Sequence, residues 1–177
     1  MLLLALSGCG GSETTASRTD NKNRNGDVEI GGMTSPTPSK WIAEPPSRQY
    51  RLAQFRLPGE GTDGDASVIV FQGIGGSLRE NIDRWEKQFP KVDVAAKKEP
   101  LTVGRLEGGF IDIQGTYNEA SGGMPGTNLQ SEPKPGYRFI GVHLSKGDEM
   151  YHIKFVGPAK TVERYKADFD AWLKGFK

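Results

Sequence analysis

Apolar residues become periodic only in the second part of the chain, from about Trp41 onward. Four segments have the alternating or β-branched apolar pattern of strands: 49–57, 66–73, 137–144 and 149–156. The last two are joined by a short turn around Lys146-Gly147, which predicts a hairpin. Residues 101–117 also read as two short strands, with the turn expected at Gly108-Gly109.

Two further segments repeat with a helical period. The first has apolar residues 4, 3 and 4 positions apart: Leu78, Ile82, Trp85 and Phe89. Ser77 and Glu80 form a capping-box pattern at its start, and Pro90 ends it. The second helix closes the chain with a stripe spaced 3, 4, 3 and 4: Val162, Tyr165, Phe169, Trp172 and Phe176. We expect the tryptophan of each stripe to face the core.

The order of these elements indicates the fold class. Strand pairs joined by short turns, with one helix in the middle and one at the end, predict an α+β domain. Its mainly antiparallel sheet should have about six strands with the helices packed on it. A Gly- and Pro-rich loop over 118–136 is long for a compact domain, and loops of that length are often functional.

The chain before Trp41 has a different composition. In the whole chain of 177 residues only 35% are hydrophobic, and the 24 glycines and 11 prolines are many for a globular protein. Residues 10–40 contain no aromatic side chain, so we predict a disordered tether there. Only Asp27–Ile30 has a pattern that could pair with another strand. The single domain is accordingly predicted over 41–177.

Cys9 is the one cysteine, and it follows the apolar run MLLLALSG. Leu-Ser-Gly-Cys resembles the lipobox of bacterial lipoproteins, in which the thiol receives diacylglycerol and a peptidase cleaves before the cysteine. The resemblance implies a signal-peptide remnant over 1–8 and a lipidated Cys9 that begins a tether over 9–40. It places the protein on a cell-envelope membrane, facing the periplasm. The outer membrane is favoured because residue 10 is not aspartate. The alternative is an incidental buried or reactive cysteine.

A second resemblance covers the domain, residues 41–177. Trp41 near an early proline, the R-x-A-x-F strand at 51–55 and FVGPAKTV at 155–162 look like bacterial lipoproteins of unassigned function with a PsbP-type soluble domain. That family implies an antiparallel sheet between helices and a role in binding protein partners or in assembly. It carries no shared catalytic constellation.

Charge and motifs limit the function classes. Lys and Arg (23) nearly balance Asp and Glu (22), so nothing indicates a nucleic-acid partner. The glycines over 73–76 either form a tight connection into the helix or hold an anion, and they match no nucleotide-binding fingerprint. His143 and His152 are expected on one sheet face, placed diagonally, where a metal would need further ligands. We predict no catalytic residues, no metal and no cofactor.

The resulting prediction is a lipid-anchored, non-catalytic binding or assembly module with an envelope protein as partner. Candidate contact residues are Met124 and Leu129 in the long loop and Trp41, which could equally lie at the edge of the core. The alternative is an envelope hydrolase that uses the 118–136 loop as a lid. A purely structural surface protein is the third reading.

Overall fold

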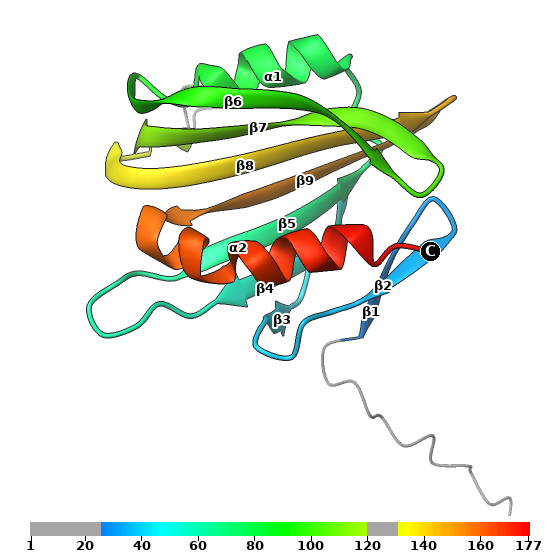
Figure 1. Cartoon of the computed structure of the whole chain (residues 1–177), viewed down its shortest axis with the longest axis horizontal. Coiled ribbons are helices and arrows are strands. Elements are labelled where there is room, and N and C mark those ends of the chain that lie inside the picture. The colour runs from blue at the N-terminus through cyan, green and yellow to red at the C-terminus, as the bar shows by residue number, and fades with distance from the viewer. Residues whose placement is uncertain (1–25, 120–130) are drawn as a thin grey trace, which may run out of the picture.

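The computed structural model describes residues 26–119 and 131–177, which are built around one antiparallel sheet (Figure 1). In chain order the elements are β1 (Asp27–Ile30), β2 (Met33–Pro36), β3 (Ile42–Glu44), β4 (Arg51–Leu57), β5 (Ala66–Gln72), α1 (Leu78–Glu86), β6 (Lys91–Val103), β7 (Leu106–Tyr117), β8 (Lys134–Lys146), β9 (Glu149–Pro158) and α2 (Ala159–Lys174). The seven-stranded sheet has the order β3-β4-β5-β9-β8-β7-β6, and every neighbouring pair is antiparallel. The predicted α+β class is confirmed.

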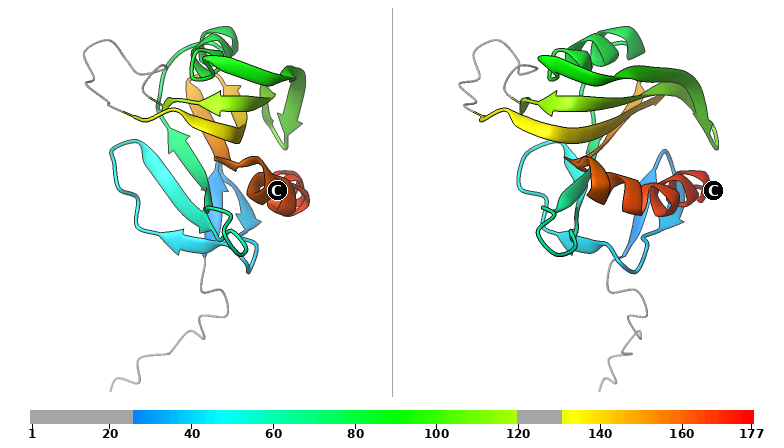
Figure 2. Two further views of the ribbon diagram at one scale, coloured as in Figure 1. Left: turned by 90° about the vertical axis from the view of Figure 1, so that its left-hand side faces the viewer. Right: turned by 60° about the vertical axis from the view of Figure 1, so that its left-hand side comes forward.

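The sheet coils around α2, and α1 lies on the opposite face (Figure 2). The apolar stripe of α2 is buried as its spacing predicts, with Phe169 and Trp172 nearly inaccessible to solvent. Trp41 packs among the same rings, with its ring centroid 5.3 Å from that of Trp172 and 5.5 Å from that of Phe55. Trp41 is 1% exposed. It is therefore a core residue, and the prediction that it contacts a partner is wrong.

Helix α1 begins as predicted, with the capping box formed in both directions. The Glu80 backbone N–H donates to the Ser77 hydroxyl (3.3 Å), and the Ser77 backbone N–H donates to the Glu80 carboxylate (2.7 Å). Trp85 is fully buried, also as predicted. Its ring lies on the sheet where Gly141 has no side chain, because a Cβ at Gly141 would stand 2.6 Å from the indole.

The predicted boundary of the domain at residue 41 is wrong, because a two-stranded hairpin precedes it. Val28, Ile30 and Met33 of β1 and β2 are buried in the core beneath α2. The hairpin is tied to the end of the chain, since Thr34 N–H donates to the Lys177 carbonyl (3.1 Å). Asp27–Ile30, whose pattern indicated that it could pair with another strand, is β1. The Gly, Ser, Thr and Pro residues that follow it give the rest of 26–40 the composition of a tether.

The strand pair β6–β7 also differs from the prediction. The turn is at Gly104-Arg105, where Gly104 has φ +54, and Gly108 and Gly109 lie inside β7. A Cβ on Gly108 would stand 1.9 Å from the His143 carbonyl oxygen, so this glycine allows close approach of strands. The 13-residue strand β6 was not predicted before residue 101. It is an exposed edge strand, protected by Pro100 and several lysines, and its apolar alternation is confined to short pieces at 92–94 and 101–103.

The buried hairpin makes a prediction about stability. Ile30→Ala should lower the free energy of unfolding by about 2–5 kcal/mol, because it removes a fully buried side chain from the core. Glu29→Ala, one residue away on the exposed face of the same strand, should change it by about 0.5 kcal/mol or less. Urea unfolding of both variants tests this. Equal midpoints for the two variants would show that the hairpin does not belong to the domain.

Candidate functional site

Helix α1 covers only part of its sheet face. It contacts β7 and β8, with Trp85 against Phe139 (ring centroids 5.7 Å apart) and against His152. The neighbouring part of the face, on β4, β5 and β9, has no helix above it (Figure 2). Apolar side chains that point to this side, including Ile69, Phe71 and Val156, are half-buried rather than enclosed.

A pocket of about 190 Å³ lies on the uncovered part, and we call it the Lys154 pocket. Its lining comes from five strands and the segments beside them: Arg51, Asp65, Ser67, Ile69, Phe71, Tyr117, Glu119, Lys134, Tyr137, Lys154, Val156 and Gly157. Strand alternation explains why these residues meet, because Ser67, Ile69 and Phe71 alternate with the buried Val68 and Val70. Across the ladder Ile69 pairs with Lys154, and Phe71 pairs with Arg51.

Lys154 brings a positive charge into this apolar setting. Its Nζ lies 5.5 Å from the centroid of the Phe71 ring and makes no hydrogen bond or ion pair with any described residue. Burial lowers the pKa of Lys154 to about 8. The field of Glu119 opposes that shift, whereas Arg84 and Arg51 add to it. A half-buried ammonium without a partner is costly unless something else compensates for the charge.

The backbone before Arg51 is distorted in a way that directs this side chain. Tyr50 has φ +68, which is rare for an aromatic residue, and a β-bulge follows between Arg51 and Ala53. The Arg51 guanidinium lies 5.8 Å from the Phe71 centroid and donates to the Ser47 hydroxyl (2.8 Å) and to Gln54. Its Nε–H is buried without a hydrogen-bond partner. Bulges and strained residues often aim side chains at functional sites.

The other charged side chains of the pocket differ in whether they already have a partner. Asp65 is occupied, since it accepts from the Gly59 backbone N–H (2.9 Å) and from Arg56 (3.1 Å). Lys134 lies at the rim, 5.5 Å from the ring centroid of Tyr137. Glu119 is exposed and makes no side-chain ion pair with a described residue. The site thus joins cations, one free carboxylate and aromatic rings, a combination suited to holding an anion.

His143 and His152 lie beside this pocket, under α1. They are directly opposite each other, not diagonal as predicted, because the turn is Gly147-Asp148 rather than Lys146-Gly147. His143 Nδ1 and His152 Nε2 are 2.9 Å apart, and both side chains are buried. Burial lowers the pKa of both imidazoles, that of His152 to about 3 with further contributions from His143 and Arg84. The pair therefore stays neutral near pH 7.

The other predicted site residues are not brought into this pocket. Cys9, Met124 and Leu129 lie outside the described residues, as does most of the predicted 118–136 lid. Within 26–119 and 131–177 no group of three or more His, Cys, Asp or Glu side chains could hold a metal ion. Neither α1 nor α2 has the length and apolar character needed to cross a membrane.

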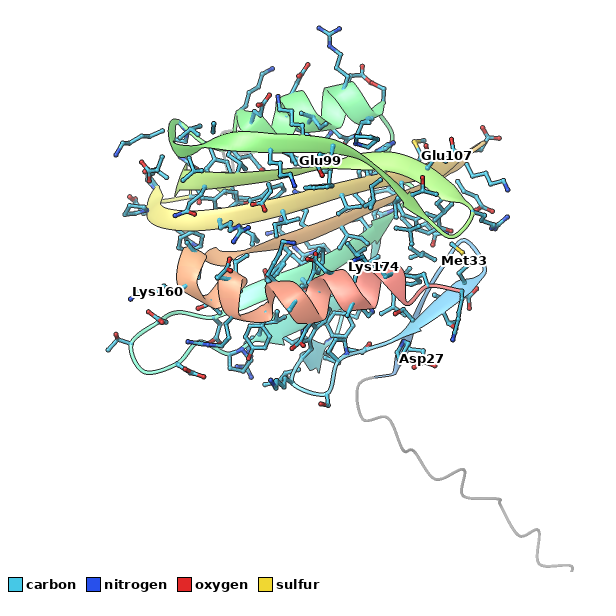
Figure 3. The ribbon with its side chains drawn as sticks, viewed as in Figure 1. Asp27, Met33, Glu99, Glu107, Lys160 and Lys174 are labelled. Carbon is cyan, nitrogen blue, oxygen red and sulfur yellow. The ribbon has the colours of Figure 1, made fainter. Side chains whose placement is uncertain are left out.

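A larger cavity, of about 320 Å³, lies between β6, β8 and α2. Glu99 and Lys174 stand on its two sides, on β6 and on α2 (Figure 3). The floor is apolar, and two of the rim lysines are paired on their own elements: Lys97 with Glu99 (2.9 Å) and Lys166 with Asp170 (2.5 Å). Because these charges are already compensated, this cavity gives a weaker chemical signal than the Lys154 pocket.

Sequence reasoning missed Lys154 and Arg51. The signal that could have found Lys154 is its place in EMYHIKFV, a strand in which the neighbouring Ile153 and Phe155 are both buried. A lysine in such a strand is unusual unless its charge has a use.

Comparisons with known proteins give fold likenesses only. No known family model and no curated protein matches the chain. Among solved structures, it is similar to PA94 from Pseudomonas aeruginosa, a protein of unknown function (TM-score 0.48, 11% identity, 84% of this chain and 93% of that chain). It is also similar to a protein from Bacteroides thetaiotaomicron VPI-5482 (0.42, 12%, 86% and 48%) and to CyanoP, the PsbP of Synechocystis sp. PCC 6803 (0.46, 11%, 97% and 98%). With TM-scores below 0.5, these likenesses carry no argument about function.

The histidine pair makes stability depend on pH. An unfolded histidine has a pKa of about 6.5, and both folded values are lower. The unfolded state therefore binds protons more readily than the folded state. The contribution of the two neutral histidines to the free energy of unfolding is complete above about pH 6.5 and decreases as the pH falls toward 3. Each imidazole should contribute a slope of up to about 1.4 kcal/mol per pH unit.

Urea unfolding of the wild type and of His152→Gln between pH 6.5 and 5 tests this, because ordinary carboxylates titrate mostly below that interval. The free energy of unfolding of His152→Gln should depend less steeply on pH than that of the wild type. Identical slopes would mean that the histidines are not buried as neutral groups.

Proposed function

We propose that this protein is a lipid-anchored, non-catalytic binding module of the cell envelope, held at the membrane through Cys9 and facing the periplasm. We further propose that the Lys154 pocket is its binding site. The observation that carries the binding role is the Lys154 ammonium, which has no partner among the described residues and lies over an aromatic floor. The lipobox-like Leu-Ser-Gly-Cys supports the anchor.

The position of the pocket is compatible with an anchor at the N-terminal end. The described chain enters the domain through β1 and β2, which pack into the core on the α2 side. The Lys154 pocket opens on the other face of the sheet, because its β5 residues alternate with the Val68 and Val70 of that core. A chain entering from the α2 side therefore leaves the pocket face free for a ligand or an envelope partner.

The histidines support a binding role over catalysis. Histidine is the side chain that proteins use most often as a general base. Here His143 and His152 are bonded to each other, and both are 3% exposed or less. The residues best suited to acid–base chemistry are thus used within the core, while the open pocket presents Lys154 and Arg51.

The anchor predicts a specific labelling result. In bacteria that express the whole chain, a fatty-acid probe should label the wild type, and the protein should sediment with membranes. Cys9→Ser should abolish both, whereas Ser12→Ala should change neither. Equal labelling of the wild type and Cys9→Ser would remove the anchor from this proposal.

If Lys154 serves binding, its buried charge should lower the free energy of unfolding of the ligand-free protein. Lys154→Met keeps most of the side-chain volume and removes a desolvated charge, so the free energy of unfolding at pH 7 should rise by about 1 kcal/mol or more. The control is Lys160→Met on the exposed side of α2 (Figure 3), which should change it by about 0.5 kcal/mol or less. A clear loss of stability in Lys154→Met alone would show that this charge serves the fold and would contradict the binding role.

A further inference from the structure

The size of the Lys154 pocket restricts what it can hold. Its volume of about 190 Å³ is below the ~300–1,000 Å³ of pockets for drug-sized ligands. A nucleotide or a long peptide segment does not fit inside. The ligand, or the part of it that enters, is therefore the size of a single ring or of a short branched chain.

The charge of the pocket restricts the ligand further. Lys154 and Arg51 both stand near one ring, 5.5 and 5.8 Å from the Phe71 centroid. The field of Glu119 opposes the lowering of the pKa of both cations, so this carboxylate offsets part of their charge. Asp65 is already held by Gly59 and Arg56. The two cations beside the Phe71 ring, partly offset by Glu119, favour a single anionic group there, while Lys134 stays exposed at the rim beside Tyr137.

The walls of the pocket differ from those of a phosphate site. Ile69, Val156 and Phe71 supply apolar surface, and the Tyr117 and Tyr137 rings are stacked at its side, 5° from parallel. Phosphate sites instead converge backbone N–H groups and several cations on a fully polar ligand. A ligand with a charged end and an apolar body would use both halves of this lining.

We propose that the Lys154 pocket binds a small monocarboxylate with an apolar body, its carboxylate between Lys154 and Arg51 and its body against Ile69, Phe71 and Val156. This inference rests on the proposed binding role and adds the ligand class. The carboxylate would supply the counter-charge that Lys154 lacks and would accept from the unpaired Nε–H of Arg51.

Proton linkage gives the binding a recognisable signature. A bound carboxylate favours the charged ammonium, so binding should raise the pKa of Lys154 from its lowered value. The affinity should consequently fall as the pH rises through about 8. The charged groups around Lys154 are Arg51 on β4, Arg84 on α1, Glu119 after β7 and Lys134 on β8. Arginine stays protonated throughout this range, so Arg51 and Arg84 do not produce this signature.

The test is an NMR titration of the full chain carrying Cys9→Ser, which stays unacylated, following the Lys154 Cε resonance. The probes are benzoate, its neutral isostere benzamide, and inorganic phosphate. Benzoate should saturate the Lys154 shift, and benzamide and phosphate should bind at least tenfold more weakly. Lys154→Met should weaken benzoate binding at least tenfold, as measured from the amide chemical shifts of Ile69 and Phe71. Lys160→Met should leave benzoate binding unchanged.

Glu119→Gln gives a second test at an exposed position where folding is not at risk, and it should tighten benzoate binding several-fold. Phosphate binding alone, or benzamide binding as well as benzoate, would overturn the ligand class and leave the binding role intact. No shift of Lys154 with any probe would overturn the inference. The stability comparison of Lys154→Met with Lys160→Met then decides separately whether the binding role stands.

Discussion

A nine-residue helix cannot cover the face of a seven-stranded sheet. Seven strands at about 4.8 Å spacing are about 29 Å wide, while α1 is about 14 Å long and about 10 Å across. On the other face the longer α2, the β1–β2 hairpin and Trp41 together complete a core. The uncovered part of the α1 face is therefore a consequence of how the chain distributes its helices, and the Lys154 pocket lies there.

Two half-buried cations, Arg138 and Lys154, differ in whether a carboxylate compensates their charge. The difference separates a cation that stabilises the fold from one that is available to a ligand. Arg138 joins Asp112 through two hydrogen bonds of 2.8 and 2.7 Å and also contacts Glu163 of α2, so its charge is compensated and its pKa is raised. That pairing ties α2 to the sheet. Lys154 has no such partner in the part of the chain that the structure describes, and its pKa moves in the opposite direction. This contrast between a compensated and an uncompensated cation supports the proposal that Lys154 serves a ligand rather than the fold.

The sequence predicted those elements whose apolar residues repeat with a clear helical or strand period. The stripes of α1 and α2 and the alternation in β8 and β9 identified the helices, the hairpin and the core tryptophans. The sequence did not predict the elements whose burial gives little pattern. Most of β6 is an exposed edge strand, and β1 and β2 have only four residues each. The pocket could not be predicted, because it depends on which strands become neighbours. Lys154 and Arg51 are 103 positions apart in the chain and meet only through the order β4-β5-β9.

The proposed binding role depends on Lys154 being a desolvated cation that no residue of 26–119 or 131–177 pairs with. Its side-chain pKa can be measured directly from the pH titration of the lysine Cε resonances, with Lys154 assigned by its absence in Lys154→Met. The account predicts that Lys154 titrates near pH 8, well below the ordinary lysine value of about 10.4. A Lys154 that titrates together with exposed lysines such as Lys160 would contradict it.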